Sequence, residues 1–297
     1  MSRRAWVAFG TVAILWGVPY LFIKVAVGEV SPVVVAWVRL VIAAIILLPL
    51  AAYRGGLRPA VARWRWVLLL GAFYMALAWT LIPLAERVLS SSLTAIIISG
   101  VPIVVTLINL RRDRPSRARI AGLGGGFVGV ALLVGLDVGV GPAQLFGVAC
   151  VLVVLICYAA GPVMTSRKLQ GVDPVATSAL AAGFASLILT PLVAFQLPNR
   201  VPSTPVLLSL AALALLCSAV ALVAWFTLIQ DAGPGRATIV IYINPAVAVI
   251  AGVLVLHERI SLTSVLGMAL ILAGSWLATT GRVPLLTRRP ASPRRAA

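Results

Sequence analysis

The feature that most restricts this chain is a succession of apolar segments of about 20 residues, separated by short segments that hold most of the arginines. About 20 residues of α-helix are needed to cross the hydrocarbon core of a bilayer. Of the 297 residues, 62% are hydrophobic and 10% are charged, whereas a soluble domain is about 45–50% apolar and about 25% charged. The sequence therefore predicts an all-α integral membrane protein.

We predict ten transmembrane helices from these segments. They span 5–27, 31–53, 66–85, 88–110, 117–136, 143–166, 174–196, 206–229, 236–256 and 261–281. Only Glu86 and Arg87 mark the boundary between the third and fourth. Because the number is even, both chain termini are expected on one side of the membrane.

The basic residues indicate which side that is. Nineteen of the 24 lysines and arginines fall in the two termini and alternate connections. The other connections hold only Arg87, Arg200 and Arg259, and Lys24 and Arg39 lie within spans. Cytoplasmic loops of membrane proteins carry an excess of Lys and Arg, so we expect both termini in the cytoplasm. The same pattern explains the net charge of +17, and nucleic-acid binding is the poorer interpretation.

The second half of the sequence matches the first at a nearly constant offset of 142 to 145 positions. The matched pairs are Trp16 and Tyr158, Pro32 and Pro174, Pro49 and Pro191, Pro102 and Pro245, Asp113–Arg114 and Glu258–Arg259, Gly122 and Gly267, and Gly129 and Gly274. We therefore divide the chain into repeats at 1–137 and 138–282, followed by a basic tail at 283–297. Five spans is an odd number, so the second repeat must be inserted inverted, as in many secondary transporters. A repeat kept only for helix packing is the alternative.

The residues of this repeat resemble the EamA-type transporters of the drug/metabolite transporter superfamily. Those that carry the resemblance are Trp16–Gly17, Lys24, Arg39, Pro102, Pro245, His257–Glu258–Arg259, Gly267 and Gly274. Within that superfamily the chain looks most like bacterial exporters of aromatic and other amino acids. The resemblance implies ten helices around a central cavity, and export of amino acids or similar small metabolites across the bacterial inner membrane.

Aromatic residues of the first and sixth spans are the first substrate-binding candidates. Trp16, Tyr20 and Lys24 recur every four residues, which places them on one helical face. Trp16 and its repeat partner Tyr158 could enclose a substrate side chain from opposite sides. Packing between helices, or an interfacial aromatic belt, is the alternative. Tyr74 and Trp79 of the third span are further candidates.

Arg39 lies eight residues into the second span. An arginine inside the membrane is costly and suggests a functional site, here for a substrate carboxylate. The alternative is a structural ion pair with Glu86 or Glu29.

Polar residues around two prolines give the remaining candidates. Ser92, Ser99 and Thr106 recur every seven residues around Pro102, and Tyr242 and Asn244 precede Pro245. Each proline frees a backbone carbonyl, and such interrupted helices in corresponding positions point to a binding site. Interhelical hydrogen bonding by small polar residues is the alternative.

All seven acidic residues lie at the ends of predicted spans, so we expect facilitated transport without a proton carrier inside the membrane. Neither a CxxC motif nor an acidic cluster for Mg²⁺ is present, so we expect no metal, no cofactor and no enzymatic activity. A multidrug or lipid carrier of the same fold is the alternative function. Gly122–Gly126 and Gly125–Gly129 have GxxxG spacing, suited to a dimer or to packing within the bundle.

Overall fold

The computed structural model describes residues 2–109, 116–133, 141–232 and 239–280, which form helices and no strands. This confirms the all-α prediction. The expected basic tail at 283–297 and the Asp113–Arg114 corner lie outside the described residues.

Among the described residues, the first predicted repeat contains ten helical elements. They are α1 (Arg3–Gly17), α2 (Pro19–Ala26), α3 (Pro32–Tyr53), α4 (Leu57–Ala62), α5 (Trp64–Leu70), the π-helix η1 (Gly71–Leu77), α6 (Ala78–Glu86), α7 (Ser91–Ile98) and α8 (Val101–Asn109), and α9 (Arg117–Leu132) completes this half. The second repeat contains α10 (Pro142–Lys168), α11 (Pro174–Ala194), α12 (Thr204–Ala211), the π-helix η3 (Ala212–Val220), α13 (Ala221–Ala232), α15 (Val240–Leu256) and α16 (Leu262–Thr280).

Each of the ten predicted spans coincides with one of these helices or with a consecutive group of them. Among the described residues, eight helical stretches are long and apolar enough to cross a membrane. The helix Val240–Leu256 is apolar but has 17 residues, and Arg117–Leu132 has 16. The structure thus supports a multi-pass protein, while the full count of ten crossings stays a prediction.

Local sequence explains where several helices begin. The side chains of Ser2, Ser31, Ser90 and Ser116 each accept a hydrogen bond from a backbone N–H in the first turn of the following helix. Such caps satisfy donors that have no partner within the helix. Pro19 is the first residue of α2, after the break from α1 at Val18, and Pro102 is the second residue of α8, after the break at Ser99–Gly100. Proline fits these positions because the first turn of a helix does not use its missing N–H.

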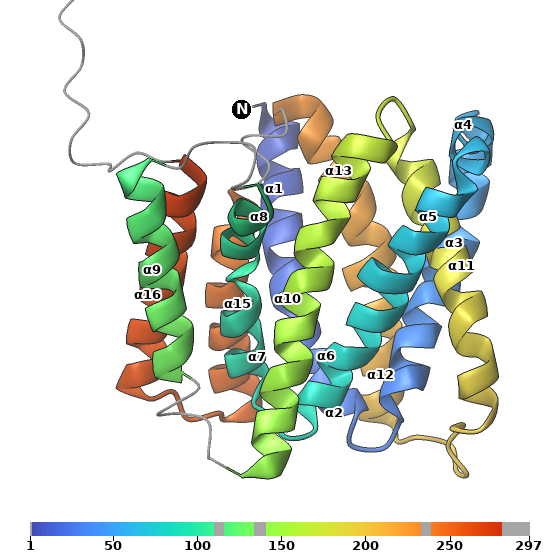
Figure 1. Cartoon of the computed structure of the whole chain (residues 1–297). Coiled ribbons are helices and arrows are strands. Elements are labelled where there is room, and N and C mark those ends of the chain that lie inside the picture. The colour runs from blue at the N-terminus through green and yellow to red at the C-terminus, as the bar shows by residue number, and fades with distance from the viewer. Residues whose placement is uncertain (1, 110–115, 134–140, 233–238, 281–297) are drawn as a thin grey trace, which may run out of the picture.

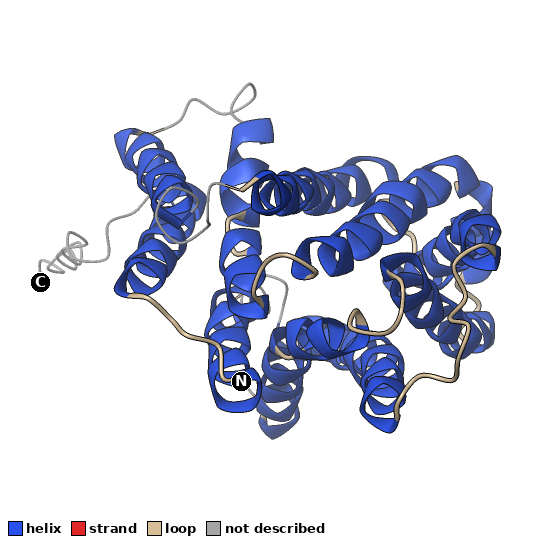
Figure 2. Ribbon diagram, turned by 90° about the horizontal axis from the view of Figure 1, so that it is seen from below, coloured by secondary structure: helices blue, strands red, loops and turns tan. Residues whose placement is uncertain are grey.

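The helices stand side by side (Figures 1 and 2). Three of the contacts join helices that occupy equivalent positions in the two predicted repeats. α9 packs against α16, α3 against α11, and α7 against α15. Two further contacts are equivalent to each other in the two repeats, because α1 packs against α13 and α10 packs against α6. The N-terminus and α4 lie at one end of the bundle. Arg63 at that end donates hydrogen bonds of 2.9 Å to the carbonyls of Lys168 and Gln170.

Glycines bring α9 and α16 into backbone contact. A Cβ on Gly122 would lie 2.7 Å from the carbonyl oxygen of Gly274, and a Cβ on Gly274 would lie 2.6 Å from that of Gly122. Gly129 and Gly267 approach each other in the same reciprocal way. Of the two proposed roles for the GxxxG spacing, Gly122 and Gly129 therefore serve packing within the bundle, while Gly125 has open space where its Cβ would lie.

The two π-helices, η1 and η3, occupy corresponding positions in the two halves. η1 packs on α11, and η3 packs on α3. Extended π-helices are rare, and short π segments are frequent at functional sites. η3 also contacts the buried Arg39 of α3, through Ser218.

Candidate functional site

Arg39 of α3 is 5% exposed and is held by an aromatic ring and a hydroxyl group. Its guanidinium carbon lies 4.2 Å from the centroid of the Trp79 ring, and its Nε donates a 3.4 Å hydrogen bond to Ser218 Oγ. Ser218 belongs to η3, and its own hydroxyl donates to the Leu213 carbonyl at 2.8 Å. The π-helix therefore supplies the hydroxyl that faces Arg39.

The predicted alternative of a structural ion pair is not seen. Among the described residues, no carboxylate oxygen lies within 4.0 Å of the Arg39 guanidinium. Glu29 instead accepts hydrogen bonds from Ser203, at 2.7 Å from the backbone nitrogen and 2.5 Å from the hydroxyl. A buried cation is costly unless partner groups stabilise it. Here the face of the Trp79 ring provides part of that stabilisation.

Three tyrosines complete what we term the central cluster, namely Tyr20, Arg39, Tyr74, Trp79 and Tyr158. The rings of Tyr74 and Tyr158 lie 5.0 Å apart at 43°, and a Cβ on Gly161 would overlap the Tyr74 ring. Tyr20 and Tyr158 are close enough to Arg39 to interact with it electrostatically. The four aromatic side chains are partly buried, so each keeps some accessible surface. Five of the ten predicted site residues therefore come together.

The other five lie in different surroundings. Trp16 packs on Trp225 of α13, with ring centroids 5.0 Å apart, while its predicted partner Tyr158 packs on Tyr74. Tyr242 contacts the Trp276 ring at 5.8 Å. The side-chain oxygen of Asn244 is buried without a hydrogen-bond partner in the described part of the chain. Trp16 therefore lies where α1 packs against α13, while Tyr242 and Asn244 belong to α15, which packs against α1.

The hydroxyl stripe around Pro102 is engaged in hydrogen bonds within the protein. Ser99 Oγ donates to the Ile96 carbonyl at 2.6 Å, and Thr106 Oγ1 donates to the Pro102 carbonyl at 2.8 Å. The Ser99 carbonyl also accepts a 3.3 Å bond from Ser275 of α16. Of these three bonds, only the one from Ser275 joins two helices, as the packing alternative predicts.

Glu86 corrects the expectation that no acidic residue is buried. It is the last residue of α6, as the sequence indicated, but it is completely buried. Neither carboxylate oxygen has a hydrogen-bond partner among the described residues. Facilitated transport therefore loses the support of an absent buried acid, and it stays a prediction. One signal for this position was available beforehand, because only Glu86 and Arg87 separate two long apolar segments.

Lys24 lies near Glu86 but bonds to the backbone. Its Nζ donates to the carbonyl oxygens of Glu86 and Leu89 at 2.5 Å and 2.6 Å. A cation suits the end of a helix where carbonyls lack partners. Lys24 thus ties α2 to the end of α6 and leaves the Glu86 carboxylate without a donor.

Glu258 caps α7 from the turn between α15 and α16. Its carboxylate accepts hydrogen bonds from the backbone nitrogens of Ser91 and Ser92, at 2.8 Å and 3.0 Å, and from the Ser92 hydroxyl at 2.5 Å. Partial burial favours the neutral acid, but these hydrogen bonds outweigh it and hold the pKa of Glu258 below its usual value. Hydrogen bonds from the Ser203 side chain and backbone likewise lower the pKa of Glu29.

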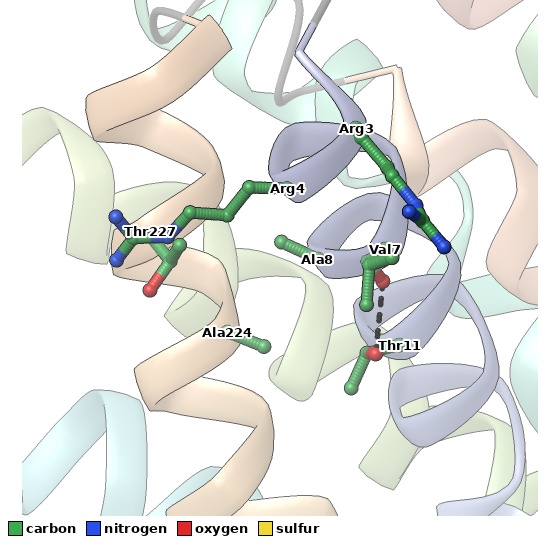
Figure 3. A pocket seen from close by; sticks show the side chains of 7 residues that line it. All are labelled: Arg3, Arg4, Val7, Ala8, Thr11, Ala224 and Thr227. Atoms are coloured by element: carbon green, nitrogen blue, oxygen red, sulfur yellow. Dashed lines mark hydrogen bonds between the residues drawn. The ribbon is translucent and has the colours of Figure 1, made fainter.

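A separate pocket of about 590 Å³ opens between α1 and α13, near the N-terminus (Figure 3). Its lining residues are Arg3, Arg4, Val7, Ala8, Thr11, Ala224 and Thr227. Arg4 also approaches Asp231, with 3.8 Å between Nε and Oδ2. The pocket contains none of the predicted site residues. Within the described ranges, no group of three or more His, Cys, Asp or Glu side chains is arranged to hold a metal ion.

Comparison with known proteins gives matches along nearly the whole chain. The model of the EamA-like transporter family matches twice, at residues 5–135 and 145–280. YedA of Escherichia coli K12, described as an uncharacterized inner membrane transporter, is 28% identical over 274 residues, covering 91% of this chain and 88% of YedA. YoaV of Bacillus subtilis, described as an uncharacterized transporter, is 23% identical, covering 91% of this chain and 94% of YoaV.

A solved crystal structure shares the fold, with a TM-score of 0.65 and 20% identity over 98% of this chain and 100% of its own length.

Proposed function

Because this chain belongs to the EamA-like transporter family, we propose that it exports neutral amino acids, aromatic ones included, or similar small metabolites by alternating access. The relatives named as transporters, one of them an inner membrane protein, support a place in the bacterial inner membrane. The arginine-rich connections support cytoplasmic termini.

The observation that carries this proposal is the surroundings of Arg39. A guanidinium group presents several donors in one plane and binds carboxylates bidentately. Here it is buried, stacked on Trp79 and without an acidic partner within 4.0 Å in the described residues. A substrate carboxylate would supply that missing partner, and the nearby tyrosine rings offer surface for an apolar or aromatic side chain.

Alternating access by two inverted halves is supported by how the repeats meet. Gly122 contacts Gly274, the repeat equivalent of Gly129, and Gly129 contacts Gly267, the repeat equivalent of Gly122. The matched glycines of the two repeats therefore meet in antiparallel order. The two π-helices also occupy equivalent positions. Halves of this kind rock against each other around a site near the midplane.

A multidrug or lipid carrier of the same fold is the competing function. The Arg39 guanidinium argues against the cationic drugs among such substrates, because like charges repel in a site with little water. A carrier of neutral lipid would have no partner to offer the buried guanidinium. A small molecule with a carboxylate fits better.

Counterflow in proteoliposomes tests the proposal. Purified protein is reconstituted with one unlabelled amino acid inside, and uptake of the labelled amino acid is followed across a panel of amino acids. We expect transient accumulation for neutral amino acids with apolar or aromatic side chains, and loss of that signal in Arg39→Ala. Trp16→Ala tests whether the first span contributes from its position on Trp225. A wild-type protein that moves no amino acid, yet moves a dye or lipid probe, would overturn the assignment.

A further inference from the structure

An acidic and a basic side chain are buried on neighbouring helices without pairing. Glu86 of α6 is completely buried, and Arg39 of α3, a helix that packs against α6, is nearly so. Trp79, which contacts Arg39, lies on α6 about two helical turns before Glu86 and on the same face of the helix. Within the described residues, however, no oxygen of Glu86 lies within 4.0 Å of an Arg39 nitrogen. A direct ion pair would be the simplest way to compensate both charges. Without it, two complementary groups remain unpaired.

Lys24 and Arg39 attract the Glu86 carboxylate electrostatically, but no group in the described part of the chain donates a hydrogen bond to it. Lys24 of α2 directs its ammonium group to the carbonyls of Glu86 and Leu89. Tyr20 is on the same helix as Lys24 and interacts with Glu86 only electrostatically. Glu258 is also acidic, and it is occupied in capping α7. A buried carboxylate that lacks a donor is costly, so Glu86 is suited to receive a hydrogen-bond donor from outside the protein.

We propose that Glu86 is the receptor for the α-ammonium group of the transported amino acid, opposite Arg39, which receives its α-carboxylate. The inference rests on the proposed function and extends it to a substrate class defined by charge. An α-amino acid carries both groups on one carbon atom, so its two receptors must be close without touching. The side chain of the substrate then lies against the rings of Tyr74 and Tyr158, which are in mutual contact.

This arrangement selects zwitterions. An α-hydroxy acid presents its carboxylate to Arg39 but leaves Glu86 without a cation. An amine that lacks the carboxylate leaves Arg39 without an anion. A site whose buried polar groups stay unpaired rejects the analogue that lacks the partner group. The transporter should therefore distinguish an amino acid from both of its analogues, which differ from it by one group each.

The test uses the counterflow assay and starts from an amino acid that the wild-type protein moves. It compares that amino acid with its α-hydroxy acid and with the amine that lacks the carboxylate. For phenylalanine the probes are phenylalanine, phenyllactate and phenethylamine. Glu86→Gln keeps the volume of the side chain and removes its negative charge. We expect the half-saturation concentration for phenylalanine to rise about tenfold or more, as for the loss of a charge-assisted hydrogen bond, with a change of less than about threefold for phenyllactate.

Glu258→Gln is the matched control, because it removes a neighbouring carboxylate that caps a helix. It should lower thermal stability and leave the preference for phenylalanine over phenyllactate unchanged. Glu86→Asp, which keeps the charge on a shorter side chain, should restore part of that preference. Size-exclusion chromatography and a melting curve of each variant separate loss of binding from loss of folding.

The outcomes separate the two proposals. If the wild-type protein moves no amino acid, the proposed function fails and the role of Glu86 fails with it. If the wild-type protein moves amino acids, but Glu86→Gln retains the wild-type ratio of phenylalanine to phenyllactate, only the role of Glu86 is overturned. A folded Glu86→Gln variant that loses both probes equally would also overturn it, because that result assigns Glu86 to the architecture of the site.

Discussion

The guanidinium carbon of Arg39 lies 4.2 Å from the centroid of the Trp79 indole ring, and this contact joins α3 to α6 inside the bundle. A cation over an indole face is stabilised by the charge distribution of the ring, and the effect grows when water is excluded. Both residues were candidates on sequence grounds, but their pairing depends on how the two helices pack. Together with the hydrogen bond from Nε to Ser218 Oγ, the contact holds the guanidinium group between α6 and η3.

The first prediction concerns the shape of the cation at position 39. Arg39→Lys retains the charge but loses the planar set of donors, so we expect the half-saturation concentration in counterflow to rise about tenfold. Arg58→Lys, on the exposed surface of α4, should behave as wild type. Equal transport by Arg39→Lys and wild type would mean that charge alone serves the site.

The second prediction concerns the contact between α9 and α16. Gly274→Ala places a methyl group about 2.6 Å from the backbone of Gly122 and Gly126, so the helices must separate. Overpacking of this kind costs about 1–3 kcal/mol, and we expect a lower melting temperature in detergent. Gly125→Ala, where nothing lies within 4 Å, is the matched control and should leave the melting temperature unchanged or raise it.

The helices could be located from the sequence because the solvent is lipid. An uninterrupted apolar stretch has one main structural solution in a membrane, and the capping serines and prolines lie next to the residues that they organise. The residues of the central cluster were identified singly, as unusual side chains inside apolar segments. Their grouping was not predicted, because it depends on which of several neighbouring helices each one faces.

Glu86 shows the limit of that approach. Charged residues between two apolar segments read as a loop, and Arg87 is indeed exposed. Neighbouring residues of a helix point about 100° apart, so Glu86 faces inward while Arg87 faces outward. The rotation of α6 about its own axis decides which of the two residues is buried. That rotation cannot be deduced from the hydropathy of the sequence.

The third prediction concerns acid stability at Glu258. Its pKa in the folded protein is lower than its ordinary value of 4.5. The ionised carboxylate therefore stabilises the folded state above the unfolded pKa, and that contribution is lost as the pH falls through the folded pKa. We expect the melting temperature of the wild-type protein to decrease as the pH is lowered below about 4.5. The melting temperature of Glu258→Gln, which lacks the ionising group, should depend less on pH in this range. Parallel pH dependence in the two proteins would contradict the prediction.

The last prediction concerns Lys24, whose ammonium group joins α2 to the carbonyls of Glu86 and Leu89. Lys24→Met keeps a long side chain but leaves both carbonyls without this donor, and an unsatisfied buried group costs about 1–3 kcal/mol. We expect the contact between α2 and the end of α6 to loosen and the melting temperature to fall.

The alkylation of Cys217 provides a second measurement. This cysteine is buried in η3, next to Ser218, which bonds to Arg39. In a background that lacks Cys150 and Cys157, alkylation of Cys217 by a water-soluble maleimide should be several-fold faster in Lys24→Met than in the parent, because water then reaches the central cluster more often. Arg87→Met, at the exposed neighbouring position, should leave the rate as it is in the parent. An unchanged alkylation rate in a destabilised Lys24→Met protein would show that Lys24 stabilises the fold without closing this end of the bundle.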